Sequence, residues 1–154
     1  MKKILLLNLL FFILIGCGYT PMYSANKKVN FYIESINFEN SDREISNFIK
    51  TNLSNYLSEN DGKKFKIDAS IDYSKNSISK NTSGKTDEYE LSFEVNFLIS
   101  YDDQNKSLLI KEVSRMKNFT DEFEELQYER SIKKNMARSI TSRLTMQLSL
   151  INAN

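Results

Sequence analysis

The sequence has no histidine and no tryptophan, and its 154 residues include one cysteine, one proline and four glycines. Without histidine the commonest general base and metal ligand is missing, which excludes Ser-His-Asp and Cys-His catalysis within this chain. A glycine-rich phosphate loop and a metal-ligand spacing are absent from the sequence as well. One cysteine cannot form an internal disulfide, so packing must stabilise the fold. These absences predict a protein that is not an enzyme and has no cofactor.

Carboxylate chemistry is the one catalytic class that the composition leaves open. The acidic pairs Asp87/Glu88 and Asp102/Asp103 and the acids between 121 and 125 fall at predicted turns and at a helix start. Acidic residues at those places have structural explanations. A carboxylate-dependent hydrolase therefore remains an alternative only if an acid pair lies in a cleft, and Asp102 and Asp103 are the residues to test.

The start of the chain has the layout of an export signal. Lys2 and Lys3 precede an apolar stretch, residues 4–15, that only Asn8 interrupts. As a helix it would span roughly 18 Å, too little for a hydrocarbon core of ~30 Å. We therefore predict a lipoprotein signal peptide at residues 1–16. The remaining chain carries 19 basic and 20 acidic side chains, a formal charge of −1, which gives no electrostatic motive for binding nucleic acid.

The cysteine follows this stretch directly, and Leu14-Ile15-Gly16-Cys17 resembles the bacterial lipobox. The resemblance implies a diacylglyceryl group on the Cys17 sulfur, cleavage before Cys17, and acylation of the freed amine, with palmitate as the expected acid. Two or more acyl chains make a stable membrane anchor, whereas one chain holds only marginally. Gly18 stands where an aspartate would commonly retain a lipoprotein in the inner membrane, so the resemblance favours the periplasmic-facing surface of the outer membrane. The alternatives are an uncleaved membrane segment and a cysteine without a role.

The first half of the remaining chain predicts a tether, a strand and a helix. Residues 17–28 are polar and aperiodic and form the lipidated tether, and residues 29–38 alternate as a strand with a bulge near Ser35. Ser41 and Glu44 have the spacing of a capping box, so a helix begins there, and Gly62 ends it by adopting a positive φ. The apolar stripe of this helix comprises Ile45, Phe48, Ile49, Leu53, Tyr56 and Leu57.

The second half predicts three consecutive strands and a long helix. Residues 65–73 and 89–101 alternate in polarity, residues 74–88 form a loop or a frayed hairpin tip, and residues 102–106 form a turn into a strand at 108–119. The order β-α-β-β-β-α predicts one α+β domain at 29–151, with two helices packed on a largely antiparallel four-stranded sheet. The final helix runs from about 121 to 151, and its apolar stripe comprises Leu126, Met136, Ile140, Leu144, Leu148 and Ile151.

Two groups of basic residues are candidate anion-binding sites. Lys75, Lys80 and Lys85 lie in the connection between two predicted strands. The second group lies on the last helix within about 140° of arc, so its members can form one stripe. An ordinary solvated face with salt bridges is the alternative for both groups. The helical group comprises Arg130, Lys133, Lys134 and Arg138.

Nearly the whole chain resembles the LPS-assembly lipoprotein family, LptE. The resemblance rests on the lipobox followed by Gly18-Tyr19, a short tether, a strand, a capped helix, the segment SGKTDEYELSFEVNFLIS entering a long strand, and a final helix with IKKNMARSITSRL. It implies a plug inside the β-barrel of the translocon subunit LptD. Such a plug assists assembly of the barrel and insertion of lipopolysaccharide into the outer leaflet.

The same resemblance implies lipopolysaccharide-binding positions on the hairpin and on the last helix. Lys134, with its neighbour Lys133, matches the helix position, and Lys80 and Lys85 are the lysines nearest the hairpin position, where Thr82 is an alternative match. A stand-alone periplasmic lipoprotein that binds an amphiphile is the alternative function. That alternative predicts a closed apolar pocket between helices and sheet, whereas a plug predicts a filled core and a broad polar surface.

Overall fold

The computed structural model describes residues 30–39 and 42–153. The predicted signal peptide at 1–16, the lipidation residue Cys17 and the tether at 17–28 therefore lie outside the described residues, as does Ser41. Within the described residues, no helix has the length and apolarity that crossing a membrane requires.

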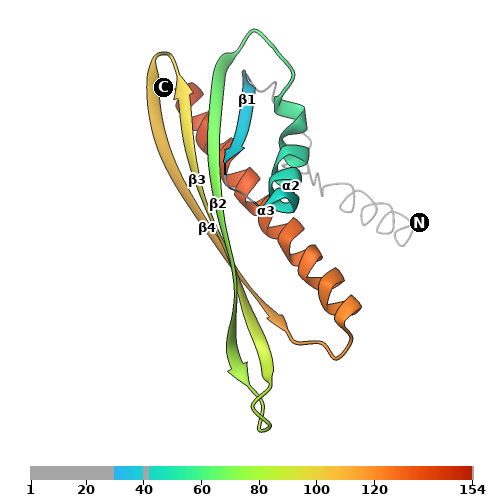
Figure 1. The fold of residues 1–154 in the computed structure, drawn as a ribbon. Helices are drawn as coiled ribbons and strands as arrows, with labels where there is room; N and C mark the ends of the chain where they lie inside the picture. The colour runs from blue at the N-terminus through green and yellow to red at the C-terminus, as the bar shows by residue number, and fades with distance from the viewer. Residues whose placement is uncertain (1–29, 40–41, 154) are drawn as a thin grey trace, which may run out of the picture.

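The described chain forms a four-stranded sheet with two helices on one face (Figure 1). The strands lie in the order β1-β2-β3-β4, with β1 parallel to β2 and the other neighbours antiparallel. This confirms the predicted α+β class and the order β-α-β-β-β-α. The elements are β1 (Phe31–Glu39), α2 (Arg43–Leu53), the 3-10 turn η2 (Ser54–Tyr56), β2 (Lys63–Lys80), β3 (Thr86–Tyr101), β4 (Gln104–Lys117) and α3 (Glu122–Ala153).

The start of α2 corrects the predicted cap by one residue. Asp42 is the N-cap, and its Oδ1 accepts hydrogen bonds from the amides of Glu44 (2.8 Å) and Ile45 (3.1 Å). A carboxylate at this place satisfies free amides and also interacts favourably with the positive end of the helix dipole. The Glu44 side chain forms an ion pair with Arg130.

The end of α2 also differs from the prediction, because the helix stops at Leu53 and η2 follows it. Leu57 is exposed, so the apolar stripe ends at Tyr56, whose ring stacks on Phe31. Gly62 does not adopt a positive φ. A Cβ on Gly62 would lie 2.1 Å from the carbonyl of Asn30, so this position needs glycine for the close approach of two strand starts.

Replacing Gly62 with alanine is expected to destabilise the protein by about 1–3 kcal/mol, because the chain around the Asn30 carbonyl has to shift. Thermal unfolding followed by circular dichroism measures the effect. The matched control is Asp61→Ala at the exposed neighbouring position, which we expect to stay within about 0.5 kcal/mol of the wild type. Equal melting temperatures for Gly62→Ala and the wild type would contradict the close approach.

The connection predicted as a loop at 74–88 is mostly strand. β2 continues to Lys80 and β3 begins at Thr86, so the two strands form an arm that extends beyond both helices (Figure 1). In the register between them Ile78 and Asp87 have no partner, which places two bulges in this arm. At the tip, Asn81 Oδ1 accepts hydrogen bonds from the amides of Ser83 and Lys85.

The turn between β3 and β4 is tighter than the predicted five residues. Asp102 and Asp103 both have positive φ, 44° and 59°, and Tyr101 pairs with Gln104. Two consecutive positive φ values define a type I′ turn, which aspartate tolerates and which matches the twist of a hairpin.

Both helices bury their apolar sides against one face of the sheet. The predicted stripe of α3 is confirmed from Met136 to Ile151, but Leu126 is exposed. At this level of α3 the residue that faces the sheet is Glu125, which pairs with Lys75 of β2. The core is made mainly of Phe31, Ile33, Ile45, Ile49, Leu53, Phe65, Ile67, Leu91, Phe93, Val95, Phe97, Ile99, Met116, Ile140, Leu144 and Leu148.

Candidate functional site

The lysines predicted to bind an anion fall in three separate places. Lys80 and Lys85 are exposed and flank the turn at the tip of the arm. Lys134 is exposed on α3, and within residues 30–39 and 42–153 none of these three side chains forms an ion pair. At about 3.3 Å per residue, Lys80 lies roughly 17 Å along the strand from Lys75, which faces α3. The structure therefore brings Lys75 close to Lys133 through their shared partner Glu129, but leaves Lys80 and Lys85 apart from both at the tip of the arm.

Lys133 belongs to the interior of the molecule. Its side chain is only 12% exposed, and its Nζ lies 3.1 Å from Glu129 Oε1 and 3.9 Å from Glu44 Oε2. The same ammonium group lies 4.4 Å from the centre of the Tyr73 ring. Its charge is therefore balanced within the fold, unlike that of Lys134.

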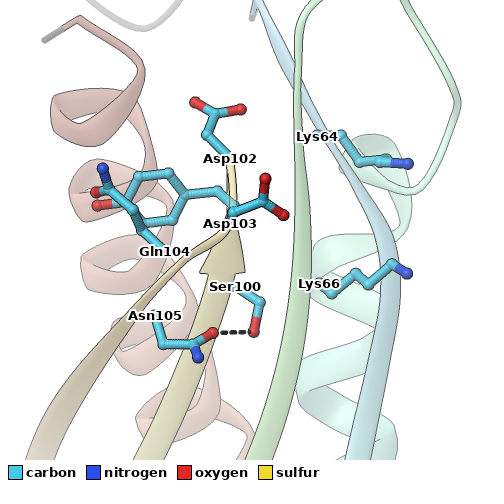
Figure 2. Close-up of a pocket in the computed structure, with 8 residues that line it drawn as sticks. Lys64, Lys66, Ser100, Asp102, Asp103, Gln104 and Asn105 are labelled. Carbon is cyan, nitrogen blue, oxygen red and sulfur yellow. Dashed lines mark hydrogen bonds between the residues drawn. The ribbon is translucent and has the colours of Figure 1, made fainter.

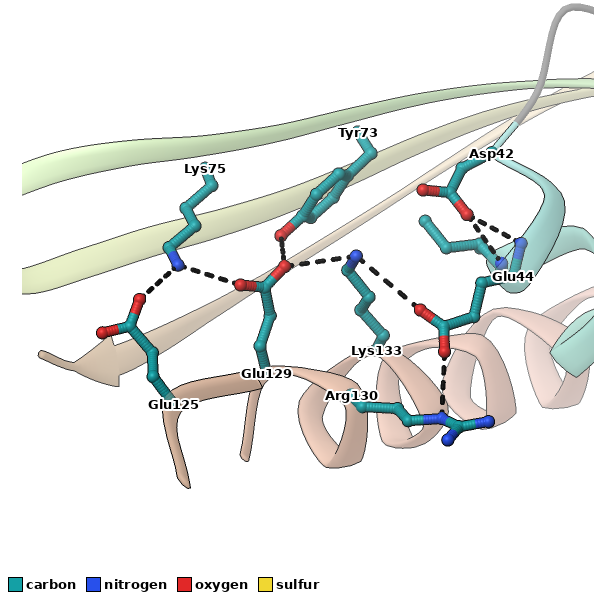
Figure 3. A network of polar contacts seen from close by, with 9 residues as sticks. Asp42, Glu44, Tyr73, Lys75, Glu125, Glu129, Arg130 and Lys133 are labelled. Carbon is teal, nitrogen blue, oxygen red and sulfur yellow. Dashed lines mark hydrogen bonds and ion pairs between the residues drawn. The ribbon is translucent and has the colours of Figure 1, made fainter. Parts of the chain in front are cut away.

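Glu129 is the centre of a polar network that joins α3 to β2 (Figure 3). Its carboxylate accepts hydrogen bonds from Tyr73 Oη at 2.7 Å and from Lys75 Nζ at 2.9 Å, in addition to its ion pair with Lys133. Its side chain is 13% exposed. A carboxylate this far from water requires such partners, because burial of an unpaired charge is costly.

Two further carboxylates extend this network at both ends. Lys75 Nζ also donates to Glu125 Oε1 at 2.7 Å and lies 4.4 Å from the centre of the Tyr89 ring. Glu44 on α2 binds Arg130 Nε at 2.9 Å. We call Glu44, Tyr73, Lys75, Glu125, Glu129, Arg130 and Lys133 the α3 clasp.

The clasp shifts the proton affinities of its members. Burial would raise the pKa of Glu129, but hydrogen bonds from Lys75, Tyr73 and Lys133 outweigh it and lower the pKa to about 2. Burial and the bond to Glu129 raise the pKa of Tyr73 well above its usual range. The bond from Lys75 lowers the pKa of Glu125, and bonds to both glutamates raise the pKa of Lys75 although burial opposes this. At neutral pH Glu125 and Glu129 are therefore carboxylates and Lys75 is an ammonium group.

The clasp supports the salt-bridge alternative for Lys75, Arg130 and Lys133. Of these three residues, only Lys75 could have been recognised from the sequence, because it lies in the inward-facing series of β2 that includes Ile71 and Tyr73. A charged residue on the inner face of a strand needs a partner from the opposing layer, and α3 provides Glu125 and Glu129.

The acid pair Asp102/Asp103 lies on the rim of an open depression of about 450 Å³ beside the β3–β4 turn (Figure 2). Asp102 pairs with Lys63 at 3.2 Å, while Ser100 Oγ donates to Asn105 Oδ1 at 2.7 Å. In Figure 2 the two aspartates point in different directions. Nor does the described part of the chain contain three or more Asp, Glu, His or Cys residues grouped to hold a metal ion. This arrangement does not provide the acid pair in a cleft that a hydrolase requires.

A second basic surface, which the sequence patterns did not predict, lies at the end of β4. Arg115 and Lys117 line an open depression of about 270 Å³ together with Phe119 and Tyr128, whose ring centres are 5.2 Å apart. Asn118 attaches this end of β4 to the arm, because its Nδ2 donates to the Thr86 carbonyl at 2.8 Å. Two cations, the exposed ring of Tyr128 and the half-buried ring of Phe119 therefore lie together at the base of the arm.

Comparisons with known proteins identify relatives by structure and not by sequence. No protein-family model matches the chain, and a search of curated proteins gives no match. The fold is similar to that of rare lipoprotein B from Shewanella oneidensis, with a TM-score of 0.61 and 14% identity over 80% of this chain and 97% of that one.

Two other lipoproteins have a similar fold. A minor lipoprotein from Acinetobacter baumannii gives a TM-score of 0.54 at 14% identity and covers 79% of this chain and 92% of its own. Lipoprotein B from Nitrosomonas europaea gives 0.53 at 16% identity and covers 81% and 88%. Because these identities are low, the comparisons establish the fold.

Proposed function

We propose that this protein is an outer-membrane lipoprotein of the LptE type. It plugs and helps to assemble an LptD-type β-barrel and assists insertion of lipopolysaccharide into the outer leaflet. The observation that carries the proposal is a fold similar to that of rare lipoprotein B in a chain whose segment Leu14–Cys17 resembles a lipobox. Its partners are thus the barrel, lipopolysaccharide and, through the lipid on Cys17, the membrane.

The packing supports a plug over a carrier of amphiphiles. A carrier needs a closed apolar pocket between helices and sheet, but that space is filled by side chains such as Phe65, Phe93 and Ile140, all with no exposed surface. The two depressions described above are open to solvent at the surface of the molecule. The stand-alone amphiphile-binding lipoprotein is therefore the weaker alternative.

The outer face of the sheet also fits a polar surrounding. Outward positions of β2 and β3 carry short polar or acidic side chains, and the lumen of a membrane β-barrel is polar. A mostly polar face of this kind can contact such a lumen, although Leu98 of β3 and Leu109 and Val113 of β4 are exposed apolar side chains. The polar positions are Asp68, Ser70, Asp72, Ser74, Ser92, Glu94 and Asn96.

Co-purification tests the proposed partner. A tag at the C-terminus of the full chain, expressed at its native level and extracted in detergent, is expected to recover a large outer-membrane β-barrel in a constant ratio. An unrelated outer-membrane lipoprotein with the same tag is the control. Recovery of the tagged protein without a barrel would refute the plug function.

Charge reversal tests the predicted lipopolysaccharide contacts. We expect Lys80→Glu with Lys85→Glu, and separately Lys134→Glu, to weaken binding to purified lipopolysaccharide roughly tenfold, since each loses a hydrogen bond to a phosphate worth about 1.5–3 kcal/mol. Surface plasmon resonance measures the affinities.

Lys106→Glu is the matched control, because Lys106 is exposed near the β3–β4 turn, at the end of the sheet opposite the arm. Lys133→Glu is unsuitable as a test, because it would also break the α3 clasp. Unchanged affinity for lipopolysaccharide in all the test variants would show that these lysines form only an ordinary solvated face.

A further inference from the structure

The outer side of β4 is a long free edge of the sheet. β4 ends the strand order, and within the part of the chain that the structure describes no segment pairs with its outer side. Edge strands are usually protected by short length, proline, bulges or charged side chains, and of these devices β4 has only charged side chains such as Lys111 and Arg115. β4 has 14 residues, no proline and an uninterrupted register with β3. This edge is therefore open to another strand.

The tight turn determines which backbone groups of β4 point outward. A two-residue hairpin turn is closed by a hydrogen-bonded pair, here Tyr101 and Gln104, and such pairs alternate with non-hydrogen-bonded ones along the ladder. Backbone N–H and C=O groups of Leu109, Lys111 and Val113 therefore point to the free edge. The Lys111 carbonyl agrees with this, because Arg143 of α3 reaches it at 3.5 Å.

Exposed apolar side chains flank this edge on both faces. Leu109 and Val113, 59% and 48% exposed, project from the outer face of β4. On the helix side, Arg143 contacts Glu112 at 2.8 Å, and Met146 and Leu150 follow it on the same side of α3, 56% and 54% exposed. A strand added to β4 would cover both pairs.

The charges along the edge select the kind of strand. Leu109, Lys111, Val113 and Arg115 alternate apolar and cationic side chains, and Lys117 adds another cation. Two copies of β4 paired antiparallel about Val113 would place Lys111 opposite Arg115, and like charges directly opposite each other are destabilising. A strand that presents acidic and apolar residues in turn on one face, at every second position, would instead gain opposite-charge and apolar pairs.

We propose that the outer edge of β4 binds an extended segment of a partner protein in which every second residue, on one face of the strand, is in turn acidic and apolar. Backbone hydrogen bonds from the outward groups of β4 would hold the segment, and the alternating side chains would select it. This site goes beyond the proposed function, because it requires neither lipopolysaccharide nor a particular barrel.

A labelled synthetic peptide tests this site directly. The probe is a fluorescein-labelled peptide in which glutamate and valine alternate at every second position with serine between them, and its control peptide has lysine in place of glutamate. Fluorescence anisotropy against the detergent-solubilised full chain is expected to show binding of the acidic peptide at least tenfold tighter than that of the basic one. Equal affinities would overturn the proposal.

Two kinds of variant locate the binding. Leu109→Pro removes an outward N–H without breaking the ladder to β3, and we expect it to weaken the acidic peptide at least tenfold. Lys111→Glu combined with Arg115→Glu keeps every backbone group and is expected to reverse the preference toward the basic peptide. Lys106→Glu, whose side chain lies on the other face of β4, is the matched control and should change neither affinity.

Two results would refute this assignment. One is unchanged acidic-peptide binding in the double charge variant. The other is a dimer of the wild type in sedimentation that Leu109→Pro dissociates, since a second copy would then be the occupant. The assay contains no barrel and no lipopolysaccharide, so its failure is distinct from failure of the proposed function.

Discussion

Glu129→Gln is expected to lower the free energy of unfolding by about 2–4 kcal/mol, because removing one partner of a largely buried ion pair leaves the other charge uncompensated. The Glu129 carboxylate is the acceptor that Tyr73, Lys75 and Lys133 share. Glutamine keeps the size of the side chain but removes the charge and one acceptor. Urea unfolding followed by circular dichroism at pH 7 measures the loss.

The dependence of stability on pH provides a second measurement of the same interaction. The pKa of Glu129 is lowered from an ordinary 4.5 to about 2, so its contribution is fully present above pH 4.5 and is lost as the pH falls toward 2. At 1.36 kcal/mol per pH unit this contribution is about 3 kcal/mol. The wild type should therefore lose stability more steeply than Glu129→Gln between these pH values.

Glu94→Gln is the matched control for this prediction. Glu94 pairs with Lys111 at 3.7 Å, and both side chains are about half exposed. Exposed ion pairs are typically worth less than 1 kcal/mol, so the same chemical change should have a small effect there. If the two variants unfold at the same urea concentration, the α3 clasp is not a stabilising network.

The order of elements could be predicted from the sequence because each element has its own local signal. The alternation at 89–101 and the stripe from Met136 to Ile151 reflect burial of one face, and both appear in the structure. The bulge expected near Ser35 is present as a register shift between Ile33 and Ser35. The parallel pairing of β1 with β2 has no such signal, because it depends on residues far apart in the chain.

The arm shows where sequence patterns fail. Residues 74–80 and 86–88 are strands without the apolar alternation that identified their neighbours. Beyond Lys75, which still contacts α3, neither face of the arm has a core to cover. The arm is held instead by the ladder and by polar contacts such as Ser77 to Thr86 at 3.0 Å. A polar composition alone could not distinguish this hairpin from a loop.

The candidate site was predicted only in part for a related reason. Lys133 and Lys134 are adjacent in sequence, but a helix rotates neighbours by about 100°, which places one inside the clasp and the other in solvent. Which of the two lysines turns inward depends on Tyr73 and Glu44, which lie on other elements. The lysine whose charge remains available to bind an anion could therefore be identified only after the sheet and both helices were placed.

Cys17→Ser is expected to abolish incorporation of labelled palmitate and to release the protein from the membrane fraction. The proposed anchor has at least two acyl chains, each CH₂ of which contributes about 0.8 kcal/mol when buried in the bilayer. Metabolic labelling followed by membrane fractionation measures both effects, and co-purification of the barrel should decline with the loss of anchoring.

Gly18→Asp separates loss of lipid from loss of location. By the sorting rule that the lipobox resemblance implies, this variant keeps its lipid but remains in the inner membrane, so labelling should persist while the outer-membrane fraction is depleted. The two variants differ from the wild type only outside the described fold, so a purified domain of either should unfold as the wild type does. A Cys17→Ser protein that is still labelled and still sediments with the outer membrane would show that Cys17 is not the attachment residue. The protein would then need another means of reaching the barrel.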